Sequence, residues 1–105
     1  MNVLYNVTVS VDKDVSDEWL EWMETTHIPE VIKTGFFIEA KLSQVLSDDE
    51  GSISFAVQYL CESMIHYEEY KILHAERLQK EHTDKYGYKT AAFRSLLLVK
   101  SNFSK

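Results

Sequence analysis

The chain has 105 residues, a formal net charge of −6 and 45% hydrophobic residues, which suits one compact domain and excludes a disordered chain. The acidic balance, without a basic cluster, argues against nucleic-acid binding. No apolar run approaches the ~20 residues of a membrane span, and the single cysteine excludes an internal disulfide framework. We therefore expect a cytoplasmic protein with no membrane partner, one domain over residues 1–100, and a C-terminal tail over 101–105.

The first half of the chain predicts a strand followed by an interrupted helix. Residues 4–12 alternate between apolar and polar side chains, as in a strand with one buried face. We expect Ser16 to be the N-cap of a helix that runs to about His27. Pro29 is expected to interrupt this helix, and a further turn is expected to end at Gly35.

The second half predicts two strands, a long helix and a last strand. Residues 36–47 and 52–61 alternate in the same way, with the inner side of the first of these strands expected to carry Phe36 and Ile38. The acidic stretch 48–51 reads as the hairpin turn between them. Ser63 is expected to cap a helix from residue 64 to about 86, which Gly87 stops. Residues 91–100 predict the fourth strand.

This order predicts an α+β fold, the ferredoxin-like βαββαβ sandwich, with a four-stranded antiparallel sheet and two helices on one face. The other sheet face is expected to be mixed, which suits two sheets that meet in a homodimer. The alternative is a solvated sheet with a few apolar residues. The candidate dimer face comprises Glu39, Lys41, Gln58, Leu60, Arg94, Leu96 and Leu98. On it, Arg94 is expected to pair with Glu39 across the dimer or to bind an anionic ligand.

Three histidines are expected on the inner helix faces: His27 on the first helix, and His74 and His82 on the second. The last two lie about 12 Å apart along their helix, so they cannot hold one metal ion, and no metal site is expected. His27 could meet either of them beneath the helices, where buried imidazoles would suit a general base. The alternative is that each histidine caps or bridges its neighbours. With Trp22 and Tyr67, these histidines form the candidate pocket.

Two other residues have simpler interpretations. Trp19 lies on the expected inner face of the first helix, so core packing is predicted for it. Cys61 is expected to point inward, like Val57 and Tyr59 at alternate positions of the same strand, and it has no basic neighbour in the sequence. A buried, unreactive thiol is therefore expected there.

Several motifs carry a family resemblance. The stretches "HIPEVIKTGFF" and "ESMIHYEEYKILHAERL" resemble the dimeric α+β barrel superfamily. Over nearly all of residues 4–99, through "YNVTV", "EWLEWM", "AVQY", "HAERLQKEH" and "AFRSLL", the chain is similar to a family of bacterial proteins of roughly this length, known as a domain of unknown function. The resemblance implies the ferredoxin-like fold and a dimer, but it names no activity.

The superfamily includes small haem-degrading monooxygenases, antibiotic-biosynthesis monooxygenases and muconolactone-isomerase-like enzymes, many with a pocket between helices and sheet. In the haem-degrading branch a histidine of the second helix ligates iron near an asparagine of the first strand. His74 or His82 and Asn6 match those places, but Asn6 is expected on the helix-free face. We therefore expect no haem and no other cofactor.

The most favoured function is a homodimer that binds a small molecule between the helices and the sheet. A cofactor-light monooxygenase or isomerase and a protein-interaction module remain as alternatives. The sequence contains no catalytic signature with defined spacing, so it leaves the question of enzymatic activity open. A cavity that holds His27 with His74 or His82 would favour the first two functions, and a solid core the third.

Overall fold

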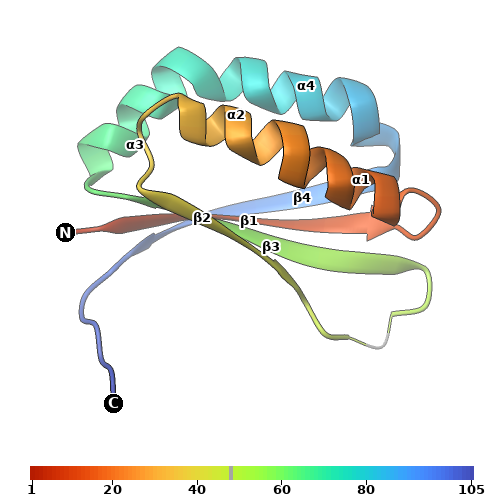
Figure 1. The fold of residues 1–105 in the computed structure, drawn as a ribbon, viewed down its shortest axis with the longest axis horizontal. Helices are drawn as coiled ribbons and strands as arrows, with labels where there is room; N and C mark the ends of the chain where they lie inside the picture. The colour runs from red at the N-terminus through yellow and green to blue at the C-terminus, as the bar shows by residue number, and fades with distance from the viewer. Residues whose placement is uncertain (48) are drawn as a thin grey trace.

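The computed structural model describes residues 1–47 and 49–105 and has the predicted order of elements. The strands are β1 (Val3–Asp12), β2 (Glu39–Gln44), β3 (Ser52–Cys61) and β4 (Thr90–Leu98); the helical segments are α1 (Ser16–Trp22), η1 (Met23–His27), α2 (Ile28–Lys33), α3 (Met64–Tyr70), η2 (Lys71–Ala75), α4 (Glu76–Tyr86) and η3 (Gly87–Lys89). Figure 1 shows the helices over one face of the sheet, while the C-terminal segment leaves on the opposite side. The predicted sheet with helices on one face is therefore confirmed.

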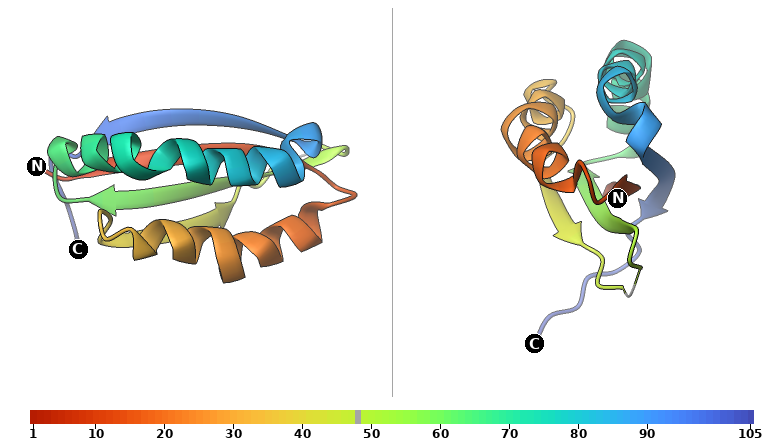
Figure 2. Two further views of the ribbon diagram at one scale, coloured as in Figure 1. Left: turned by 90° about the horizontal axis from the view of Figure 1, so that it is seen from above. Right: turned by 90° about the vertical axis from the view of Figure 1, so that its right-hand side faces the viewer.

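The sheet has the strand order β2-β3-β1-β4, and every neighbouring pair is antiparallel. The alternating side chains of β1 explain its central position. Val3, Tyr5, Val9 and Val11 are buried because they face the helices. Figure 2 shows the two helical runs side by side over this face.

The register of β4 corrects one prediction. Its pairing with β1 aligns Val3 with Leu98, Tyr5 with Leu96 and Val7 with Arg94. Residues directly opposite each other in an antiparallel pair share a sheet face. Arg94, Leu96 and Leu98 therefore face the helices, and their expected place on the helix-free face was wrong. The alternation of apolar and polar residues could not show which side chains of β4 face the helices. Leu96, Leu97 and Leu98 follow one another, so apolar residues lie on both faces of the strand.

The residues that β4 contributes to the helix-free face thus differ from the predicted ones. Of the candidate dimer face, Glu39, Lys41, Gln58 and Leu60 do lie on it, in register with Leu4 and Asn6 of β1. From β4, the side chains of Phe93 and Leu97 replace those predicted. Asn6 lies on this face as expected and its side-chain amide donates to the hydroxyls of Thr8 and Ser95. An Arg94–Glu39 pair across sheets that meet through this face is therefore excluded.

The first helical run continues through Pro29, where an interruption was expected. Segment η1 is a π-helical turn in which the N–H of Ile28 donates to the carbonyl of Met23, five residues back. A π-turn leaves a carbonyl without its usual donor, so a residue that lacks an N–H is tolerated just after it. The run ends at Lys33, and Gly35 follows with a φ of 87°, as predicted for a helix stop.

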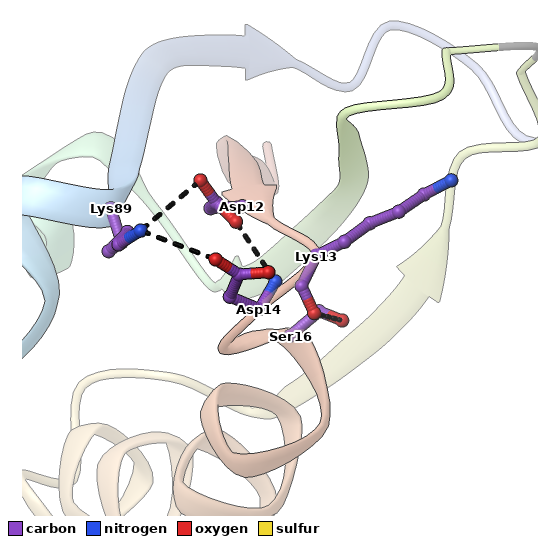
Figure 3. Close-up of polar contacts among 5 residues, drawn as sticks. All are labelled: Asp12, Lys13, Asp14, Ser16 and Lys89. Carbon is purple, nitrogen blue, oxygen red and sulfur yellow. Dashed lines mark hydrogen bonds and ion pairs between the residues drawn. The ribbon is translucent and has the colours of Figure 1, made fainter.

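Polar contacts tie the start of this run to the sheet (Figure 3). Ser16 is not the N-cap; it is the buried first residue of α1, and its hydroxyl donates to the carbonyl of Lys13 at 3.2 Å. The Nζ of Lys89 lies 3.6 Å from a carboxylate oxygen of Asp12 and of Asp14. These pairs are partly exposed, so solvent screens them and each contributes little to stability.

The second helical run spans the predicted residues and contains its own π-turn, η2. Ser63 caps it as expected, because its hydroxyl accepts a hydrogen bond from the N–H of His66 at 3.4 Å. Before β2, however, it is Phe37 that is buried, while Ile38 is 53% exposed. The predicted acidic turn begins at residue 48, which lies outside the described residues.

The core lies between the sheet and the helices. Trp19, Leu78 and Cys61 are fully buried in it, so the prediction of core packing for Trp19 is confirmed. Residues 99–105 have no regular secondary structure, and Phe103 is 94% exposed. Among the helices of residues 1–47 and 49–105, none has the length and hydropathy to cross a membrane.

Candidate functional site

A cavity of about 40 Å³ lies between the centre of the sheet and both helical runs. Apolar and aromatic side chains form most of its wall, and its nitrogen-bearing side chains are His27, Gln79, His82 and Arg94. A cavity needs only ~10–15 Å³ to hold one water molecule, so this one can hold a small group of atoms. The enclosed space therefore suits a small polar group, with any larger body of a ligand placed toward the open side.

His27 and His82 meet at this cavity from different helical runs. Their ring centroids lie 5.9 Å apart, and the ring of Trp22 stacks on His27 at 5.1 Å with an interplanar angle of 28°. The Nδ1 atom of His27 is buried and has no hydrogen-bond partner among the described residues. Buried polar atoms are rarely left unpaired, so this nitrogen marks a place where a ligand or water can bind.

Both imidazoles are held neutral at physiological pH. Burial, followed by repulsion from His82 if it is protonated and from the positive charge of Arg94, lowers the pKa of His27 to about 4. Burial and then the charge of Arg94 also lower the pKa of His82. A general base works best when its pKa is close to the operating pH. His27 is therefore better suited to hydrogen bonding in its neutral form than to proton transfer.

Trp19 determines the tautomer of His82. The Nε1–H of Trp19 donates to Nε2 of His82 at 2.9 Å, and the bond is buried. Because the indole N–H can only donate, Nε2 carries the lone pair and Nδ1 carries the proton. Protonation of His82 would break this bond, which adds a reason for the ring to remain neutral.

Arg94 forms the cationic part of the site. It lies on an edge strand and is exposed, yet its Nε donates to the hydroxyl of buried Tyr5 at 3.2 Å. Within residues 1–47 and 49–105, no carboxylate forms an ion pair with it. Strand pairing, rather than side-chain alternation, was the signal that could have placed this residue in the cavity.

Three tyrosines of the cavity wall were not among the predicted site residues. Tyr5 contacts Tyr59 and Tyr70, with ring centroids 5.8 and 6.2 Å apart. Burial raises the pKa of both Tyr59 and Tyr70, so their hydroxyls stay protonated. The wall therefore offers hydrogen-bond donors and aromatic surface, without negative charge.

The structure separates the other predicted pocket residues from the cavity wall. Tyr67 packs on Tyr5, with the ring centroids 5.1 Å apart, and Trp22 stacks on the ring of His27. His74 packs against Phe36 at 5.7 Å and borders a shallow depression on the outer surface of the second helical run. Of the two histidines expected as partners of His27, the structure brings His82 of α4 to it, while His74 of η2 does not line the cavity.

Two further observations limit the chemistry of the site. The thiol of Cys61 is buried, its Sγ lies 3.5 Å from the carbonyl of Val3, and burial raises its pKa. This supports the prediction of an unreactive thiol. Among the residues that the structure describes, no three His, Cys, Asp or Glu side chains are grouped to hold a metal ion.

Comparison with protein families matches residues 2–100 to the "Domain of unknown function (DUF4286)". Comparison with curated proteins finds no match. The matched range covers all regular secondary structure of the chain.

Many solved structures share this fold. A dimeric ferredoxin-like protein from an uncultured marine organism has a TM-score of 0.73 at 12% identity, with 98% of this chain and 99% of that chain covered. SnoaB, a cofactor-independent oxygenase from Streptomyces nogalater, has a TM-score of 0.69 at 10% identity, with 100% of both chains covered. An ethyl tert-butyl ether d (EthD) family protein from Bacillus halodurans has a TM-score of 0.66 at 9% identity, with 89% and 96% covered. At these identities the likeness confirms the ferredoxin-like fold.

Proposed function

Since this chain belongs to the DUF4286 family, a domain of unknown function, we propose a function from its own geometry: a homodimer that binds a small organic molecule between the helices and the sheet. The buried, unpartnered Nδ1 of His27 beside His82 is the observation that carries this proposal. A ligand that hydrogen-bonds this nitrogen would remove the cost of leaving a buried polar atom unpaired, about 1–3 kcal/mol.

Binding is favoured over catalysis for an electrostatic reason. The pKa of His27, about 4, makes its imidazole a weak base near neutral pH. The thiol of Cys61 is buried away from solvent, so it is a poor nucleophile. The oxygenase activity in the description of SnoaB belongs to that protein, and no group in this cavity specifically favours the same chemistry here.

The homodimer is supported by the helix-free face and by the related folds. Phe93 is 70% and Leu97 45% exposed on this face, on either side of Ser95, and contact with a second copy would remove both from water. Two solved structures of the same fold are described as dimeric. The polar residues Glu39, Lys41 and Gln58 of β2 and β3 would border the apolar contact on one side, as polar residues do at the rim of an interface. A cytoplasmic location belongs to the same proposal and is supported by the free thiol of Cys61.

Intrinsic fluorescence can test binding, because the only two tryptophans, Trp19 and Trp22, contact His82 and His27. Benzamide is a suitable first probe, since it is neutral, flat and carries one amide. We expect a saturable fluorescence change that His27→Ala weakens by about tenfold, the effect of one lost buried hydrogen bond.

His66→Ala provides the control, because His66 lies near the start of α3, apart from the cavity. If this variant lowers the affinity as much as His27→Ala, or if neither benzamide nor benzoate produces a saturable change, the proposed binding site is wrong.

A further inference from the structure

The exposed, unpaired guanidinium of Arg94 at the cavity is the feature that the proposed function leaves unexplained. Resting on that function, we propose that the ligand is a small aromatic or aliphatic carboxylate and that Arg94 binds its carboxylate group. The chain has 17 acidic residues and a net charge of −6. Even so, among the described residues no acidic side chain pairs with Arg94.

The hydrogen bond to Tyr5 orients the guanidinium. The Nε of Arg94 donates to the Tyr5 hydroxyl at 3.2 Å, and this tyrosine is only 4% exposed, so its position is fixed by the core. The terminal nitrogens of Arg94 remain available. Such nitrogens bind a carboxylate through parallel hydrogen bonds that are about twice as strong as neutral ones. Tyr5 is thus a positioning residue for Arg94.

The rest of the cavity favours an anion over a neutral or cationic ligand. None of the described residues that line it is Asp or Glu, so no fixed negative charge repels a carboxylate. Neutral His27 and His82 can add hydrogen bonds without a second charge to be desolvated. The cavity volume of about 40 Å³ exceeds the ~10–15 Å³ that a cavity needs to hold one water molecule, so it can receive a small head group such as a carboxylate.

The strand next to Arg94 provides an apolar surface for the body of the ligand. Ala92 and Leu96 flank Arg94 on the same face of β4, because side chains two residues apart in a strand share a face. Leu96 is 41% exposed, so its side chain is accessible beside the cationic group. A carboxylate with a small hydrocarbon body matches this combination of an arginine and an apolar surface.

The test compares benzoate with benzamide, which have nearly the same shape but differ in charge. In tryptophan fluorescence titrations at low ionic strength, we expect the wild-type protein to bind benzoate at least about tenfold more tightly than benzamide. Arg94→Gln should remove this preference while its affinity for benzamide changes little. Arg94→Lys should retain part of it, since the charge remains and the planar fork is lost.

Arg77→Gln is the matched control, because Arg77 is the other arginine of the chain and lies near Glu81 on α4, 57% exposed. It makes the same change in net charge and should leave benzoate affinity unchanged. Tyr5→Phe should weaken benzoate binding more than benzamide binding. Equal affinities for the two probes, or an equal loss of benzoate affinity in Arg77→Gln and Arg94→Gln, would overturn the carboxylate assignment. The proposed function would survive that result; it fails if neither probe binds, or if His66→Ala lowers the affinity as much as His27→Ala.

Discussion

The indole N–H of Trp19 donates a buried hydrogen bond to Nε2 of His82, with a distance of 2.9 Å. This bond joins the first helical run to the second at the point where both cover the cavity. It also keeps the lone pair of Nε2 occupied, so His82 can present only its Nδ1 edge to other partners. A residue that the sequence indicated as core packing thus also controls a residue of the candidate site.

We therefore expect Trp19→Phe to destabilise the protein by about 2–4 kcal/mol, since it leaves a small void and an unpaired buried acceptor. Urea unfolding measures this change. The pKa of His82, followed by NMR, should rise because protonation would no longer break a hydrogen bond. Trp22→Phe is the control: it keeps an aromatic ring on His27 and removes no donor to His82, so a loss as large as that of Trp19→Phe would contradict this account.

The buried state of His27 predicts how stability changes with pH. Its pKa is about 4 in the folded protein and 6.5 ordinarily, so between these values the unfolded chain binds more protons. The free energy of unfolding should then fall as the pH decreases from about 6.5 to 4, by roughly 2–3 kcal/mol for this group. His27→Gln should flatten the curve in this window, measured by urea unfolding at several pH values.

For this experiment His66→Gln is the matched variant, because the His66 side chain is 43% exposed. It should retain the wild-type slope. If His27→Gln also retains that slope, the imidazole of His27 is not held neutral by the folded structure.

The register of β4 predicts which of two neighbouring leucines lies in the dimer interface. Leu97 lies on the helix-free face and Leu96 on the opposite one, although they are neighbours in the chain and are 45% and 41% exposed. Leu97→Asp should weaken dimerisation strongly, because a carboxylate buried in an apolar contact is costly. Leu96→Asp should affect it little. Sedimentation velocity over a range of concentrations distinguishes the two, and a larger effect of Leu96→Asp, or a wild-type monomer throughout, would reject this interface.

We also predict that the protein does not form a stable haem complex. Asn6 lies on the helix-free side of the sheet, while Nε2 of His82 is already bonded to Trp19. Titration with haemin, followed by absorbance near the Soret maximum, should give no saturable stoichiometric spectrum. A saturable spectrum that disappears in His82→Ala or His74→Ala would show that this prediction is wrong.

The sequence was sufficient for the order of elements, because each has a clear periodicity and the hairpin between β2 and β3 limits the topology. It also identified His27 and His82 as neighbours of a pocket, although it could not choose between His82 and His74. Arg94 was assigned to the wrong face because β4 carries apolar side chains on both faces. Only the pairing of β4 with β1 shows which of its side chains face the helices. Similarly, Pro29 was interpreted as a stop, since periodicity alone does not distinguish an α-turn from a π-turn.

The two π-turns restrict how the length of this chain can vary. Trp19, Met23, His27 and Val31 follow one another at intervals of four residues, and all but Trp19 line the cavity. An uninterrupted α-helix advances about 100° per residue, so such a stripe would drift around the helix by about a third of a turn. The wide turn η1 corrects this drift. Deleting one residue from Met23–His27 would convert it to an α-turn and rotate Val31 away from the sheet, so insertions and deletions should be tolerated after β4, in residues 99–105, but not within either helical run.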